Sequence, residues 1–161
     1  MFKVSHTTLI VLSGLVWLVV GCFLLPLGLN FITEILLKEN ATQPHPVLHF
    51  LAPYVGGLES AALIWIAFTL LLGFLKGRRV FAKGVKRSVN RILSLPNPTH
   101  LSKIYTPAYY LLLGSMVLLG VIVRFAPLDI RGGVDIAVGT ALINGAILYF
   151  RQAWLVYRTV G

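Results

Sequence analysis

Long apolar stretches dominate the chain and predict helices that cross a membrane. A helix needs about 20 mostly apolar residues to span a hydrocarbon core of ~30 Å. We expect four spans, over residues 8–33, 52–75, 107–125 and 131–150. The predicted fold class is therefore all-α: a polytopic membrane protein with a bundle of four transmembrane helices in a single domain.

The first apolar stretch is longer than one straight span requires. It runs from Thr8 to Leu37 and contains Pro26, followed by Gly28 and Asn30. Proline removes a helical hydrogen bond and disturbs the turn before it. We expect a kink or break at this point, with residues 31–38 continuing as an outer, partly interfacial helix.

Composition supports a lipid environment. The chain is 57% hydrophobic and only 12% charged, whereas soluble domains carry about 25% charged residues. The single cysteine, Cys22, excludes an internal disulfide and a paired-cysteine redox or zinc site. We expect no cofactor and no metal.

The basic residues predict the orientation. The loop over residues 76–106 contains no acid, and its basic residues are Lys76, Arg78, Arg79, Lys83, Lys86, Arg87, Arg91 and Lys103. Loops rich in Lys and Arg stay in the cytoplasm. We expect a multi-pass protein of a bacterial inner membrane with both termini cytoplasmic. The net charge of +9 then reflects membrane topology, and we expect no nucleic-acid partner.

Part of this basic loop is amphipathic. On a helical wheel of residues 80–95 the apolar side chains Phe81, Val85, Val89, Ile92 and Leu93 share one arc. The opposite arc carries Arg79, Lys83, Lys86, Arg87, Asn90 and Arg91. The pattern predicts a helix in the plane of the interface whose basic face binds anionic phospholipid headgroups. The alternative is a loop that only sets the topology.

The two halves of the chain are weakly similar. The segment Gly56–Glu59 resembles Gly132–Asp135, because each places two glycines just before an acid. Each acid lies about 25 Å from the first basic residue that follows in its helix, at 1.5 Å per residue. We therefore expect two tandem helical hairpins related by an axis along the membrane normal. Chance similarity remains open, because glycine and leucine are frequent in this chain.

Ionisable and polar residues at membrane depth are the candidate site. Glu59 and Asp135 form the expected ion or substrate pathway together with Asn144 in the last span and Arg124 before it. The alternatives are structural: Asp135 pairs with Arg124 or Arg131, and Asn144 packs between helices.

Metal and enzyme chemistry have weaker support. His45 and His49 have a spacing that suits a metal on a helix, but the prolines around them favour an ordinary loop. The chain contains none of the common nucleophile, zinc-protease or phosphate-loop motifs. Asp129 and Asp135 leave a membrane aspartic peptidase open, although an enzyme is not the favoured class.

Two functions remain after these exclusions. The leading hypothesis is a small transporter or channel component that moves a cation or small solute, working as a homo-oligomer or in a larger membrane complex. The alternative is a non-transporting accessory subunit that binds another membrane protein or anionic lipid. Acids gathered along a polar seam would favour transport, whereas a dry bundle would favour the accessory subunit.

Overall fold

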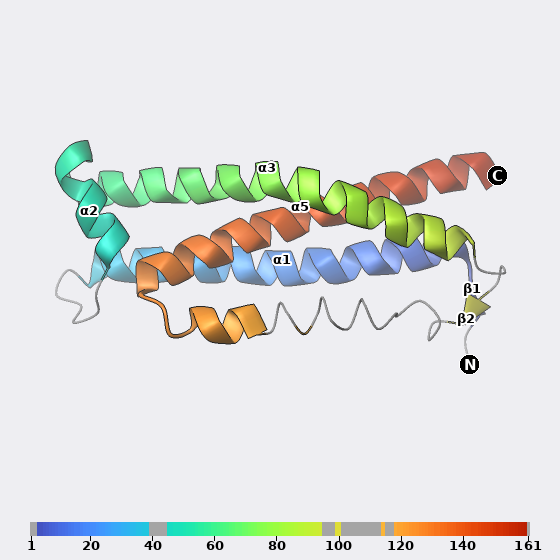
Figure 1. Ribbon diagram of the computed structural model, residues 1–161, viewed down its shortest axis with the longest axis horizontal. Helices are drawn as coiled ribbons and strands as arrows, with labels where there is room; N and C mark the ends of the chain where they lie inside the picture. Colours follow the sequence, from blue (N-terminus) through green and yellow to red (C-terminus); the bar gives the residue numbers. More distant parts are fainter. Residues whose placement is uncertain (1–2, 39–44, 95–98, 101–113, 115–117, 161) are drawn as a thin grey trace.

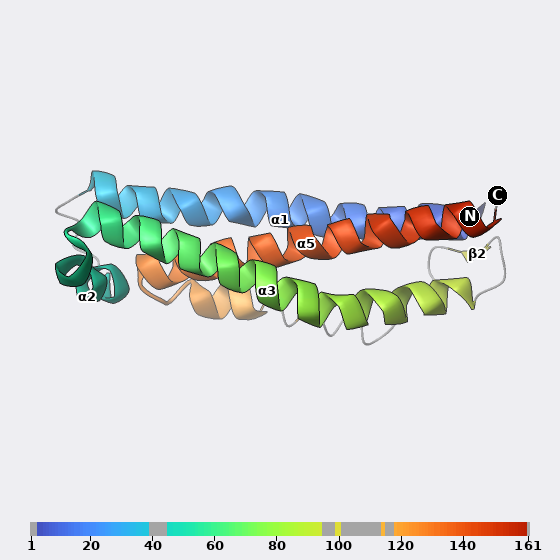
Figure 2. The ribbon, with the colours of Figure 1, turned by 90° about the horizontal axis from the view of Figure 1, so that it is seen from above.

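Three long helices lie side by side along the molecule (Figures 1 and 2). The computed structural model describes residues 3–38, 45–94, 99–100, 114 and 118–160. The long helices are α1 (His6–Leu37), α3 (Leu58–Leu93) and α5 (Leu128–Val160), and the short helix α2 (Pro46–Val55) lies at one end. The strands β1 (Lys3–Val4) and β2 (Thr99–His100) form a two-residue antiparallel pair at the other end.

The predicted all-α architecture is confirmed, with three candidate membrane spans among the described residues. Helices α1, α3 and α5 are each long and apolar enough to cross a membrane. Many of their large apolar side chains remain exposed, as lipid-facing surfaces require. The predicted third span, 107–125, falls mostly outside the described residues, of which 118–123 are helical. A bundle of four helices and its tandem hairpins therefore stay predictions.

The ends of the helices show how the chain alternates along the bundle. Both termini and the C-terminal end of α3 lie at the same end of the molecule. Helix α2 and the first turn of α5 lie at the opposite end (Figure 1). Which end faces the cytoplasm stays a prediction that rests on the basic residues.

Of the kink or break expected at Pro26, the structure rules out the break. It runs without interruption through Pro26 for 32 residues, and Ser5 caps its first turn by accepting from the Thr8 amide at 3.3 Å. Beyond the proline, Ile32 and Ile35 are still buried in the bundle. Continued packing on both sides of Pro26 maintains the helix where the local sequence alone predicts a break.

Helix α3 corrects two further expectations. It begins at Leu58 and not at Ala52, because Gly56 and Gly57 have φ values of 87° and 143° and separate it from α2. Such left-handed φ values favour glycine. Helix α3 then continues unbroken to Leu93, so residues 80–93 belong to it and form no separate interfacial helix.

The apolar arc of that segment packs against protein. Val85, Val89 and Ile92 are at most 3% exposed and belong to one core cluster with Leu9 of α1 and Tyr149 of α5. The predicted apolar arc holds for Val85, Val89 and Ile92, whereas Leu93 is 41% exposed, and the buried part of the arc contacts protein and not lipid. Apolar periodicity cannot tell a lipid chain from another helix, and here α1 and α5 cover the arc.

Helix α5 is the central helix, and both ribbon views place it between α1 and α3. Antiparallel α1 contacts it through Gly21 and Gly28, where an added Cβ would lie 2.9 Å from the Gly139 carbonyl oxygen and 2.7 Å from that of Gly132. Only glycine permits such close approach of two backbones. The seam between α1 and α5 is therefore too tight to admit water at these glycines.

A second seam joins α5 to α3, which runs parallel to it. An added Cβ on Gly77 would lie 2.7 Å from the Ala141 Cα, and Gly73 makes a still closer contact with the backbone of Ala137. Both contacts join residues 64 positions apart, as does the bond between Trp65 and Asp129. The offset of 64 therefore relates residues of α3 and α5 that lie at the same level along the bundle.

Candidate functional site

The two acids of the predicted pathway lie at different levels. Glu59 is exposed in the first turn of α3, and Asp135 is half-buried on α5. The α3–α5 offset places Asp135 level with Leu71, which is ~18 Å from Glu59 along the axis at 1.5 Å per residue. The matched depth expected from their spacing to Lys76 and Arg151 is thus absent, because α3 and α5 are shifted along each other.

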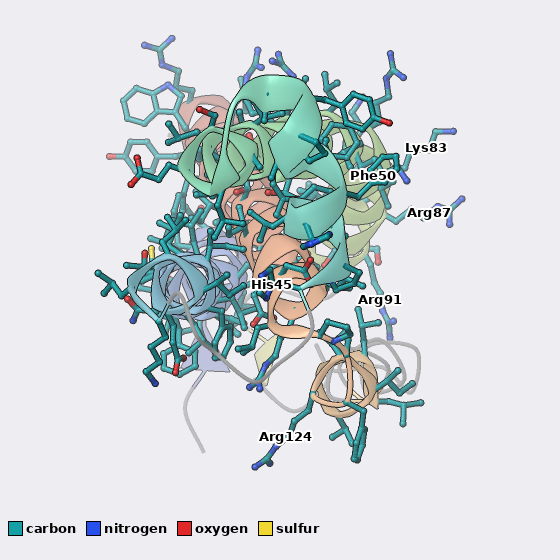
Figure 3. All side chains as sticks on the ribbon, turned by 90° about the vertical axis from the view of Figure 1, so that its left-hand side faces the viewer. His45, Phe50, Lys83, Arg87, Arg91 and Arg124 are labelled. Carbon is teal, nitrogen blue, oxygen red and sulfur yellow. The ribbon has the colours of Figure 1, made fainter. Side chains whose placement is uncertain are left out.

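Asp135 lies near Arg131 and not near Arg124. Arg131 is one helical turn before it on α5, close enough for an electrostatic interaction. The Arg131 guanidinium also lies over the Phe31 ring of α1, 4.2 Å from its centroid. Arg124 is exposed and projects away from the bundle (Figure 3). Of the two structural partners considered for Asp135, the geometry favours Arg131.

Asn144 is half-buried and bonds within its own helix. Its side-chain nitrogen donates to the Thr140 carbonyl oxygen at 3.1 Å, and the Thr140 hydroxyl donates to Ile136 at 2.8 Å. The next residue, Gly145, lies against the Trp17 ring. These contacts fit the packing interpretation of Asn144 better than a role in a pathway.

Among the acids that the structure describes, Asp129 is the most completely engaged, and it is 0% exposed. One carboxylate oxygen accepts from the backbone amides of Val47 at 2.6 Å and Leu48 at 3.3 Å, and the other accepts from its own neighbour Ile130 at 2.8 Å. Pro46, the first residue of α2, has no amide hydrogen to offer. Asp129 therefore satisfies the free amides at the start of a helix more than 80 residues away in sequence.

A second bond makes Asp129 the junction of three helices. The Trp65 indole of α3 donates to the Asp129 backbone carbonyl at 2.9 Å. Sequence reasoning considered Asp129 only as a possible peptidase acid and missed this role. The available signal was weak: α2 begins with proline, and His45 makes no side-chain cap bond. These bonds from three backbone amides make Asp129 a structural cap.

Of the two histidines expected in a loop, His49 lies within α2 and His45 is the residue before it. The prediction of an ordinary loop is therefore wrong for His49. Among the described residues, no group of three His, Cys, Asp or Glu side chains is arranged to hold a metal ion.

The C-terminal half of α3, residues 76–93, presents a basic face. Its exposed cations are Lys76, Arg78, Arg79, Lys83, Lys86, Arg87 and Arg91. Figure 3 shows Lys83, Arg87 and Arg91 projecting to one side, away from the bundle. No acidic residue occurs between residues 76 and 93. We name the six of these cations other than Arg78 the basic face, because at 100° per residue they share one side of α3, and this segment contains no acid.

No family model, no curated protein and no solved structure matches this chain. Its function is therefore inferred from its own residues, and the basic face and the tightly packed seams are the features that carry the inference.

Proposed function

We propose that this protein is a non-transporting accessory membrane subunit whose basic face on α3 binds anionic phospholipid headgroups of the cytoplasmic leaflet. The observation that carries the proposal is a row of exposed cations with no acid beside them, on a helix long enough to cross the membrane. Each basic residue near an anionic membrane surface contributes about 1 kcal/mol of binding free energy.

The packing of α5 supports a structural role for the membrane helices. Glycine contacts close α5 against α1 at Gly21 and Gly28 and against α3 at Gly73 and Gly77. Polar side chains near these seams bond locally, as Asn144 does to Thr140. Close packing of this kind holds the helices in a fixed arrangement that presents the basic face.

A transporter or channel component is the second candidate. Its supporting observation is the half-buried Asp135. An ionisable side chain at membrane depth costs free energy and usually marks a functional site. Glu59 and Arg124 are exposed and do not join Asp135 in one cluster. Transport would therefore need a path completed by further copies of the chain or by another subunit.

The test compares two matched double variants of the full chain. Lys83→Gln with Arg87→Gln removes two cations from the basic face. Lys38→Gln with Arg124→Gln removes one lysine and one arginine, both exposed, elsewhere. Each protein is purified from liposomes of equal phosphatidylglycerol and phosphatidylcholine, and the retained lipids are measured by mass spectrometry.

The proposal predicts enrichment of phosphatidylglycerol on the wild-type protein and on the control variant. The basic-face variant should lose that enrichment several-fold, and raising the salt concentration should weaken it in the wild type. Equal enrichment on both variants would contradict the proposed function.

A further inference from the structure

An aromatic contact fixes one common level of the three helices. The rings of Trp17 on α1 and Phe81 on α3 meet edge to face, with centroids 4.7 Å apart. An added Cβ on Gly145 of α5 would lie 3.3 Å from the Trp17 ring and 3.6 Å from the Phe81 ring. Residues within one helical turn of these three positions therefore lie at nearly the same depth in a membrane.

At that level the outer surfaces of α1 and α3 differ in character. Around Trp17, α1 exposes the apolar side chains of Leu15, Val19 and Val20, which are 47%, 58% and 41% exposed. Around Phe81, α3 exposes members of the basic face, among them Arg79 and Lys83. One flank of the bundle suits acyl chains at a depth where the opposite flank suits anions.

Helix α5 marks where the membrane lies by two of its arginines. The 20 residues from Arg131 to Arg151 on α5 span ~30 Å, the thickness of the hydrocarbon core. The α3–α5 offset places Arg151 level with Arg87. Most of the basic face, from Lys76 to Lys86, then lies inside the hydrocarbon core, on the membrane side of the cytoplasmic boundary that Arg151 marks.

The membrane could instead be placed farther from the cytoplasmic end, so that the cations of α3 lie outside the hydrocarbon core, but this placement exposes apolar side chains of α1 and α5 to water. It would place Leu12 and Leu15 of α1 and Ile147 of α5 in water, although all three are large, apolar and at least 40% exposed. Tilting the bundle does not remove the conflict, because a tilted helix needs a longer apolar stretch. The stretch of α3 from Glu59 to Lys76 spans ~25 Å and is already shorter than the core.

We propose that the basic face draws phosphate headgroups of the cytoplasmic leaflet from their usual plane toward the middle of the bilayer, so that this leaflet is locally thinned beside α3. The inference rests on the proposed function and adds the depth at which the lipid binds. Exposed Phe74, Leu75 and Val80 lie next to the cations on α3, which suits an amphiphile with a phosphate and acyl chains. Long Lys and Arg side chains also extend toward the cytoplasmic surface, where they can meet the displaced headgroups.

Two spin-label positions test the depth. In a Cys22→Ala background, which removes the exposed native thiol, one protein carries a label at Leu15 and another at Val80, which is 64% exposed. Leu15 lies nearer to the cytoplasmic end than Val80, judged from the Trp17–Phe81 contact. Accessibility to oxygen and to a water-soluble nickel complex is measured for both in liposomes containing phosphatidylglycerol.

The proposal expects the label at Leu15 to be lipid-like and the deeper label at Val80 to be reached by the nickel complex. Adding Arg79→Gln and Lys83→Gln should make the Val80 position several-fold less accessible to nickel, whereas Lys38→Gln with Arg124→Gln should not. A water-exposed Leu15 with a lipid-like Val80 would overturn the depth assignment even if anionic lipid is still enriched. Polar access at Val80 without anionic-lipid enrichment would overturn headgroup binding, because water alone would then account for the access of the nickel complex.

Discussion

The Asp129 carboxylate accepts a hydrogen bond of 2.6 Å from the backbone amide of Val47, 82 positions earlier in the chain. This bond attaches the first turn of α2 to the first turn of α5, and the Trp65 indole adds α3 to the same junction at 2.9 Å. One buried acid thus joins α2, α3 and α5 at the end of the bundle opposite the termini.

Removing this cap should release α2. Asp129→Ala leaves the amides of Val47 and Leu48 without their acceptor, and we expect a loss of about 1–3 kcal/mol in the free energy of unfolding. Asp129→Asn keeps a side-chain oxygen and should cost less, because asparagine is a good helix cap. Hydrogen exchange of the two amides is the measurement. Unchanged exchange in Asp129→Ala would show that the cap does not hold α2.

The seam between α1 and α5 should tolerate no added side chain. In Gly28→Ala the new methyl group would meet the Gly132 carbonyl oxygen at 2.7 Å, and we expect about 1–3 kcal/mol of destabilisation. The control is Gly84→Ala on α3, where nothing lies within 4 Å and a helical alanine should be neutral or stabilising. Chemical unfolding in detergent measures both. A variant Gly28→Ala as stable as Gly84→Ala would argue against the close seam.

Neighbouring residues on α3 test whether the C-terminal half of that helix packs on protein. Ile92 is 2% exposed and Leu93 is 41% exposed. We expect Ile92→Ala to cost about 2–5 kcal/mol, as for other buried aliphatic side chains, and Leu93→Ala to cost much less. If this half of α3 left the bundle for the membrane interface, the two substitutions would have similar, small effects on stability.

The long helices could be predicted from the sequence because a run of apolar residues is a local signal. The amphipathic faces of residues 80–93 were also local, but the same apolar arc suits lipid or a neighbouring helix. Only tertiary packing shows that Val85 and Val89 contact α1 and α5. The continuity of α1 through Pro26 has the same origin, since packing on α5 offsets the lost hydrogen bond.

The candidate site was harder to predict because it depends on how the helices are shifted along each other. Spacing within one helix suggested that Glu59 and Asp135 lie at equal depth. The contacts of Gly73 and Gly77 with α5 set a different relative shift, and no single-helix spacing contains that information. The hydrogen bond from Val47 to Asp129 could not be predicted from the sequence either, because its partners belong to distant segments.

Ion flux distinguishes the two candidate functions. For a non-transporting subunit, proteoliposomes of the wild-type chain should show no more cation or proton flux than empty liposomes, and Glu59→Gln or Asp135→Asn should change nothing. A flux above that background that both substitutions abolish would instead support the transporter, with the two acids on one path.

Photochemical crosslinking tests the central claim, lipid binding by the basic face, most directly. A photoreactive residue at Asn90 sits among the cations of α3 and removes none of them, and Asn90 is exposed. The control position is Phe23 of α1, which is 69% exposed on an apolar surface. We predict lipid adducts at both positions in native-like membranes, with anionic phospholipid enriched at Asn90 and no headgroup preference at Phe23. Protein adducts at Asn90, or lipid adducts without preference for anionic headgroups, would contradict the account.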